Sequence, residues 1–173
     1  MVSRCLRSGA IALALCLPVA ARAQASFLVM GGVAAPVGRL SDFTDIGYNL
    51  GAGVNIGAPV LPIGVRLEGA YNNFGWKNNN NSTSIISGTA NAIFNIGTQR
   101  DAPYLIAGLG IYNRGSDGFS SSATTVGING GGGLRFPLTG FSTFFEARYH
   151  IMLGSNNEGA NFQFIPITFG LMF

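Results

Sequence analysis

Four charged residues lie at alternate positions in two strand-like segments and have the types needed for a buried ion network. Arg66 and Glu68 are two residues apart, and so are Glu146 and Arg148. Side chains two residues apart in a strand point to the same face, so each pair shares one face of its strand. Buried charges must be paired, because their desolvation is otherwise very costly. The spacing therefore predicts that these two acidic and two basic groups neutralise one another.

A second set of residues has the types of a hydrolytic triad. His150, Ser155 and Glu158 follow one another near the end of the chain, and a carboxylate, an imidazole and a hydroxyl together can activate a nucleophile. In the alternation of its segment, however, His150 shares a face with Glu146 and Arg148. The simpler interpretation is a histidine whose ring nitrogens form hydrogen bonds with neighbours on that face.

Eight segments that must position these residues alternate between apolar and small or polar residues with a period of two. This pattern is typical of strands whose two faces have different surroundings. Their expected bounds are 26–37, 47–57, 63–74, 83–97, 103–113, 124–137, 141–153 and 162–173. One face is lipid-compatible and the other is small, polar or charged, the inverse of a soluble barrel with an apolar interior. The phase of the first segment stays open, because Phe27 and Val29 are as apolar as Leu28 and Met30.

The first 23 residues have the three parts of a secretory signal peptide. Arg4 and Arg7 precede an apolar run at 11–17, and an Ala-Arg-Ala cleavage site ends at residue 23. We expect cleavage there, which leaves a mature domain of residues 24–173. Both cysteines and three arginines would leave with the peptide, so that seven basic residues balance seven acidic ones. We therefore expect no disulfide, no metal site and no basic excess for nucleic acid.

The mature chain has the pattern of a closed transmembrane barrel. Its apolar runs are too short for a spanning helix, which needs about 20 residues. In hydrocarbon every backbone group must be paired, and a closed barrel is the other structure that achieves this. Compact turns alternate with longer polar loops, as in outer-membrane barrels, whose turns face the periplasm. The sequence predicts an all-β, eight-stranded antiparallel barrel in a bacterial outer membrane, with both termini periplasmic.

In such a barrel the third and seventh strands lie opposite each other. The four charged residues are therefore expected to meet near the middle of the lumen. We expect a salt-bridged plug that closes the lumen to ions, with Arg135 near its periplasmic end and His150 above it. The alternative is that water solvates these charges in a narrow cavity.

Four segments carry a family resemblance: residues 145–150, 165–173, 103–110 and 130–136. They resemble the outer-membrane β-barrel domain family, the OmpA- and OmpX-like group of eight-stranded porin-family proteins, across essentially the whole mature chain. The resemblance implies a lumen with ion pairs and leaves the function open, because members of the group differ in their roles. An eight-stranded lipid A deacylase family also carries late His, Ser and Glu residues. Its His and Ser are separated by one residue, whereas His150 and Ser155 are five apart.

The last strand ends on Phe173, with Phe169 and Leu171 in the same phase. This ending resembles the signal by which the barrel-assembly machinery recognises its clients. The resemblance implies that machinery as a partner during biogenesis, with Phe173 as the most sensitive position. The alternative is that Phe173 is only a lipid-facing ring at the membrane interface.

These patterns favour a monomeric, non-enzymatic barrel without a cofactor, with a role in membrane integrity or surface interactions. Its expected partners are outer-membrane lipid and lipopolysaccharide, and no nucleic acid. The alternative is a narrow channel for ions or small solutes, and a lipid A-modifying hydrolase is the long shot. No ligand for the loops follows from the sequence.

Overall fold

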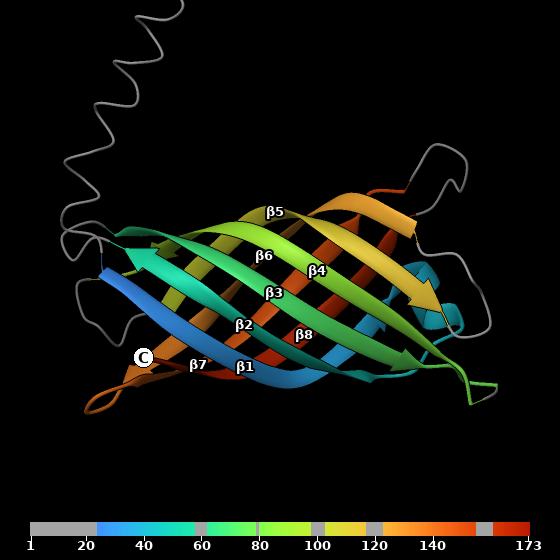
Figure 1. The fold of residues 1–173 in the computed structure, drawn as a ribbon, viewed down its shortest axis with the longest axis horizontal. Helices are drawn as coiled ribbons and strands as arrows, with labels where there is room; N and C mark the ends of the chain where they lie inside the picture. Colours follow the sequence, from blue (N-terminus) through green and yellow to red (C-terminus); the bar gives the residue numbers. More distant parts are fainter. Residues whose placement is uncertain (1–23, 58–61, 79, 98–102, 117–122, 155–160) are drawn as a thin grey trace, which may run out of the picture.

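The computed structural model describes residues 24–57, 62–78, 80–97, 103–116, 123–154 and 161–173. The strands are β1 (Gln24–Val37), β2 (Gly47–Gly57), β3 (Ile63–Gly75), β4 (Ser82–Asn95), β5 (Pro103–Ser116), β6 (Ala123–Pro137), β7 (Ser142–Met152) and β8 (Phe162–Met172). They form one closed antiparallel barrel, in which each strand pairs with its sequence neighbours and β1 closes on β8 (Figure 1). The predicted fold class is confirmed. Within the described ranges, none of the helices has the length and apolar character needed to span a membrane.

The two ends of the barrel differ in their connections. The start of β1 and the C-terminus lie at the same end (Figure 1), which we call the turn end. The turn between β6 and β7 lies there too, where the Leu138 N–H donates to the Phe141 carbonyl at 2.8 Å and Gly140 adopts a φ of 90°. A left-handed φ of this kind favours glycine. The opposite end, which we call the loop end, carries a short 3-10 helix, η1 (Gly38–Asp42).

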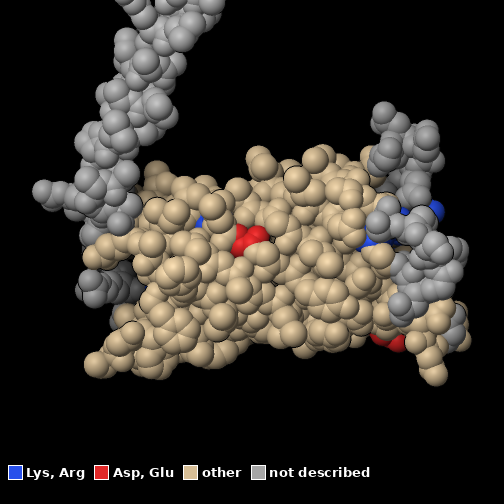
Figure 2. Space-filling view, in the orientation of Figure 1, with Lys and Arg blue, Asp and Glu red and all other residues tan. Residues whose placement is uncertain are grey.

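The outer wall is apolar. The face shown in Figure 2 is mostly uncharged between the two ends of the barrel, apart from an acidic residue near its middle and a few basic atoms to one side of it. The open question about the first strand is also resolved, because Phe27 is 67% exposed on the outside while Leu28 is 1% exposed on the inside. The bounds of all eight strands agree with the predicted ones to within three residues.

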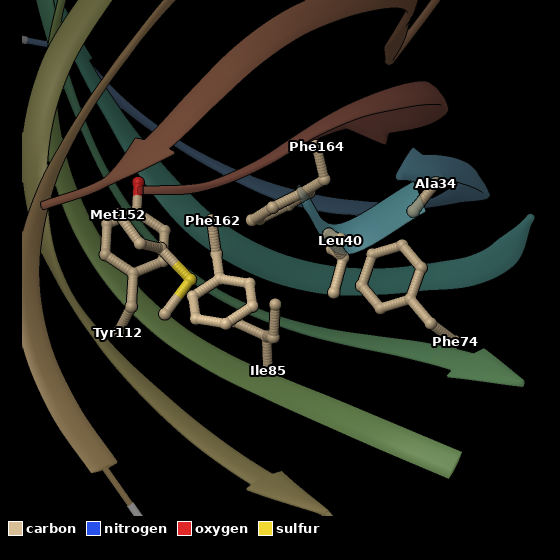
Figure 3. Packing of buried hydrophobic residues seen from close by; sticks show 8 residues of the cluster. All are labelled: Ala34, Leu40, Phe74, Ile85, Tyr112, Met152, Phe162 and Phe164. Atoms are coloured by element: carbon tan, nitrogen blue, oxygen red, sulfur yellow. The ribbon is translucent and has the colours of Figure 1, made fainter. Parts of the chain in front are cut away.

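The lumen is not lined only by small, polar or charged residues, and that expectation was wrong. A loop-end cluster packs inside the barrel (Figure 3) and consists of Ala34, Leu40, Phe74, Ile85, Tyr112, Met152, Phe162 and Phe164. The interior contains two further apolar clusters. One consists of Leu28, Met30, Phe144 and Met172, and the other of Ile93, Tyr104 and Ile106. An eight-stranded barrel is narrow enough for side chains to fill it, so interior apolar groups pack against one another.

The connection between β1 and β2 is also more ordered than the polar loop expected there. Within η1, Leu40 has no exposed surface and packs into the loop-end cluster. The Thr44 hydroxyl donates to the Leu40 carbonyl at 2.6 Å, and Thr44 forms a β-bridge with Trp76 beyond β3. The helix therefore packs over the loop end of the lumen.

Candidate functional site: the charged lumen

The middle of the lumen contains the four charged residues that the sequence placed on β3 and β7. These strands lie four positions apart around the ring, so they face each other across the lumen. Arg66 is fully buried, and Glu68, Glu146 and Arg148 are 7%, 1% and 3% exposed. We call these four residues the charge network.

Each carboxylate of the network lies between two guanidinium groups. Glu146 Oε2 accepts a hydrogen bond from Arg66 Nη1 at 2.8 Å, and its Oε1 lies 2.8 Å from Arg148 Nε as an ion pair. Glu68 Oε1 pairs with Arg148 Nη2, while Glu68 Oε2 lies 3.9 Å from Arg66 Nη1. The charges therefore alternate in sign around the network, and their formal sum is zero.

A tyrosine that sequence reasoning missed completes the network. The Tyr104 hydroxyl donates to Glu146 Oε2 at 2.6 Å. Tyr104 is on β5 and Glu146 is on β7, so the ring must pass over β6 between them. It does so at Gly133, where an added Cβ would lie 2.6 Å from the Tyr104 hydroxyl. The absence of a side chain at Gly133 lets Tyr104 reach the carboxylate.

The same arrangement recurs toward the loop end. The Tyr112 hydroxyl lies 2.9 Å from His150 Nδ1, again from β5 to β7. It passes Gly127 on β6, where an added Cβ would lie 2.8 Å from the Tyr112 ring. The glycine-rich character of β6 thus serves two interior tyrosines. The signal was present in the sequence as tyrosines in the inward phase of β5 beside glycines on the next strand.

The ion pairs of the charge network have favourable geometry, but some N–H donors of its arginines have no hydrogen-bond partner. Removing two ion pairs from water is offset only by good geometry and further hydrogen bonds, one of which Tyr104 supplies. Among the described residues, Arg66 Nε and Nη2 and Arg148 Nη1 have no hydrogen-bond partner. The network is therefore electrically balanced without being fully satisfied.

Arg135 and His150 lie on opposite sides of the network. The Arg135 guanidinium lies over the Tyr104 ring, 5.4 Å from its centroid, and forms no ion pair with any described residue. His150 stacks on Phe164 with ring centroids 4.8 Å apart. His150 is therefore part of the packed interior, and the other two candidate triad residues, Ser155 and Glu158, lie outside the described residues.

The remaining buried polar side chains are mainly asparagines and threonines, and Asn49, Asn72 and Asn129 fall in the polar phase that the alternation predicts for the inner face. Asn129 Nδ2 donates to Asn91 Oδ1 at 2.9 Å, and Asn49 Nδ2 donates to Asn72 Oδ1 at 2.6 Å. The first pair reaches over β5 from β6 to β4, the second joins the neighbouring strands β2 and β3, and both line the lumen with amide groups. Within the described part of the chain, no group of His, Cys, Asp or Glu has an arrangement that could hold a metal ion.

The three residues of the expected assembly signal lie on the outer face of β8 and at its end. Phe169 is 55% and Phe173 is 60% exposed, with Leu171 half-buried in the same phase. The Phe173 N–H donates to the Phe27 carbonyl at 2.8 Å, and the Phe27 N–H donates back at 3.0 Å. The final residue therefore takes part in closing the barrel between β8 and β1.

Comparisons with known proteins agree with this architecture. A family model described as "Outer membrane protein beta-barrel domain" matches residues 9–173. No curated protein matches the sequence. Among solved structures, Neisserial surface protein A (NspA) is similar with a TM-score of 0.69 at 18% identity, covering 87% of this chain and 97% of that one.

Two further solved structures are similar. The N-terminal β-barrel domain of Pseudomonas aeruginosa OprF gives a TM-score of 0.51 at 17% identity, covering 88% of this chain and 98% of that one. The attachment invasion locus protein Ail of Yersinia pestis, solved with the heparin analogue sucrose octasulfate, gives 0.50 at 18% identity, covering 87% and 99%. At these identities the similarity shows the fold alone.

Proposed function

Since the chain belongs to the outer membrane protein β-barrel domain family, and so to the bacterial outer membrane, we propose that it is a non-enzymatic barrel with a closed lumen. Its role on this proposal is structural or interactive. The barrel adds a rigid, lipid-embedded wall to the membrane, and its loops face outward, where partners can reach them. Outer-membrane lipid and lipopolysaccharide are the partners of the wall.

The observation that carries this proposal is the charge network between apolar layers. Arg66 and Glu146 meet across the lumen at 2.8 Å, which leaves no room for an ion to pass between them. The loop-end cluster lies on one side, where Phe74 and Phe164 pack with ring centroids 5.8 Å apart. Packed apolar groups exclude water, and hydrophobic constrictions of this kind block conduction.

The proposal is tested by single-channel recording of the refolded protein in planar bilayers. We expect no steady conductance, because an ion would have to displace paired charges and then cross the aromatic layer. Heat-modifiable gel mobility must first show that the barrel is folded. Steady, salt-dependent conductance from the folded barrel would overturn the closed lumen and favour the narrow channel instead. One observation supports that alternative. The buried Oδ1 atoms of Asn49 and Asn129 accept no hydrogen bond from any described residue, so polar acceptors remain unused in the lumen.

The orientation follows from the family's usual topology. An even number of strands places both termini on one side, and short turns face the periplasm in such barrels. On this proposal the turn end and both ends of the mature chain are periplasmic, and residues 1–23 are a cleaved signal peptide. We also propose that the barrel works as a monomer.

Phe173 provides a separate prediction about biogenesis. Phe173→Ala keeps the backbone pairing with Phe27 but loses the aromatic ring that the assembly machinery is proposed to read. We expect several-fold less folded barrel in the outer membrane of cells, measured by heat-modifiable mobility, and unchanged refolding of the purified protein in detergent. Phe136→Ala is the matched control, because Phe136 is a comparably exposed aromatic at the turn end of β6. Equal losses in both variants would contradict a signal role and leave Phe173 as a membrane anchor.

A further inference from the structure

The lipid-facing wall is recessed where β2, β3 and β4 lie side by side (Figure 1). The recess is a groove of about 580 Å³ that crosses the outer face of β2–β6. Its floor consists of small residues that pair across neighbouring strands, Ala52 with Gly69 and Gly69 with Gly88. An added Cβ at Gly88 would meet no atom within 4 Å, so the space above this floor is open. The volume lies in the range of about 300–1,000 Å³ that is usual for small-molecule sites.

The sides of the groove are apolar. Leu67 on β3 and Leu109 and Ile111 on β5 border it, and they are 49%, 67% and 60% exposed. Glu68 also borders it, but the Glu68 side chain is only 1% exposed and pairs with Arg148 inside the barrel. A polar group without a hydrogen-bond partner is costly in hydrocarbon. The groove therefore suits a hydrocarbon chain.

The groove runs obliquely along the wall. Val126, its lining residue on β6, lies eleven residues before the turn-end residue Pro137. Ala52, its lining residue on β2, lies only five residues before the turn-end residue Gly57. Because both strands finish at the turn end, the groove rises toward the loop end from β2 to β6. A chain that enters beside β6 would descend across β5, β4 and β3 toward the middle of the wall.

Uncharged hydrogen-bonding groups border the groove on its loop-end side. Next to its β5 and β6 end, Asn113 Nδ2 donates to Thr124 Oγ1 at 2.8 Å. Next to its β3 floor, Asn73 Nδ2 donates to the Tyr71 hydroxyl at 3.2 Å and to Ser82 Oγ at 3.1 Å. We call these five residues the polar rim. Within the described ranges, no outward-facing side chain of β2–β6 carries a charge.

The chemistry of the polar rim favours one kind of head group. Amides and hydroxyls both donate and accept hydrogen bonds, so they match the many hydroxyls of a saccharide. A phosphate is bound best by guanidinium or ammonium groups, which the outward face of these strands does not present in the described residues. A ligand that matches both features has a saccharide head and a hydrocarbon chain.

The geometry points to a binding site for one glycolipid on the outer face of β2–β6, with its saccharide at the polar rim and one acyl chain in the groove. The site rests on the proposed orientation, in which the loop end faces outward. Lipopolysaccharide combines a saccharide with acyl chains, and its lipid A part is the occupant. The wall then binds one lipid at a fixed place, in addition to contacting the lipid that surrounds it.

The test is native mass spectrometry of the refolded, full mature barrel in detergent micelles, titrated with lipid A and separately with phosphatidylglycerol. We expect one lipid A to bind per barrel with saturation. Phosphatidylglycerol should bind roughly tenfold more weakly, because its chain fits the groove while its head group lacks the saccharide. Equal affinity for the two lipids, or the absence of a saturable lipid A site, would overturn the inference.

Variants locate the site on the wall. Gly88→Leu places a side chain in the groove and should weaken lipid A binding roughly tenfold. Gly130→Leu is the matched control, because Gly130 does not line the groove and its added Cβ would meet only the Ile106 carbonyl oxygen at 3.9 Å. Asn113→Leu should weaken binding of lipid A and leave that of phosphatidylglycerol unchanged. If Gly88→Leu does not refold, Ala90→Leu repeats the test in the same groove.

Unchanged lipid A binding in the groove variant, or an equal loss in Gly130→Leu, would overturn the site. These outcomes are separate from those that test the closed lumen, because the groove and the polar rim lie on the outside of the barrel. A barrel that conducts can still bind lipid A, and a closed barrel can lack the site. Binding in detergent also has no sidedness, so it is measured independently of the orientation.

Discussion

Glu146→Ala should lower the free energy of unfolding of the barrel by about 3–5 kcal/mol, because it breaks a buried ion pair from one side. Glu146 engages Arg66, Arg148 and Tyr104 at 2.6–2.8 Å. Its removal leaves two buried guanidinium groups facing only Glu68, and a buried hydroxyl without an acceptor. The measurement is urea-induced unfolding in lipid vesicles, followed by tryptophan fluorescence.

Glu68→Ala is the natural comparison, because both variants remove one carboxylate from the same network. Glu68 pairs closely with Arg148, but its second oxygen lies 3.9 Å from Arg66 and has no hydrogen-bond partner among the described residues. We therefore expect a smaller loss from Glu68→Ala than from Glu146→Ala. Losses below about 1 kcal/mol for both would indicate that water solvates these charges, as exposed pairs are solvated.

The same two variants also test the closed lumen. Removing Glu146 takes away the carboxylate that joins β3 to β7, so the folded fraction of Glu146→Ala should conduct where the wild type is silent. Glu68→Ala keeps the Arg66 to Glu146 contact at 2.8 Å and should stay silent. A silent Glu146→Ala barrel of normal stability would reject the charge network as a plug.

The strands were predictable from the sequence because the membrane imposes a strict two-sided pattern on them. Val65 and Leu67 had to face lipid, which placed Arg66 and Glu68 in the lumen. A closed ring of eight strands then places β3 opposite β7. Pairing four charges across the lumen required only this topology and the counting of residues along each strand.

The contents of the lumen were less predictable, because alternation separates two faces without saying how interior side chains pack. β1 is apolar in both phases, so only its pairing with β2 and β8 places Leu28 inside and Phe27 outside. Leu40 is the only apolar side chain of η1 (Gly38–Asp42), and its burial depends on η1 folding over the loop end. Tyr104 reaches Glu146 across an intervening strand, a contact set by the height of β5 relative to β7 rather than by either segment alone.

Gly133→Ala should destabilise the barrel by about 1–3 kcal/mol through overpacking, although alanine is normally the better residue within a strand. The new Cβ would lie 2.6 Å from the Tyr104 hydroxyl and 2.6 Å from the Phe145 carbonyl oxygen. The carbonyl belongs to the backbone of β7, and the hydroxyl is bound to Glu146. Neither can move away without breaking an interaction, so the strain is not relieved cheaply.

Gly130→Ala is the matched control on the same glycine run. Its Cβ would have only one neighbour within 4 Å, the Ile106 carbonyl oxygen at 3.9 Å, which is an ordinary contact. We expect it to be neutral or stabilising by about 0.5–1 kcal/mol, because glycine loses more backbone freedom on folding than alanine. The comparison separates the general effect of a methyl group on β6 from its effect beneath Tyr104.

A double-mutant cycle with Tyr104→Ala identifies the source of the Gly133→Ala penalty. If the Tyr104 ring is the group that must shift, the double variant should lose less stability than the sum of the two single variants, with a coupling of about 0.5–3 kcal/mol. Additive losses would assign the penalty to the Phe145 carbonyl alone, and Gly133 would then serve only the approach of two backbones. Sub-additive losses would show that the glycine is needed for the tyrosine to reach Glu146, which connects the composition of β6 to the charge network in the lumen.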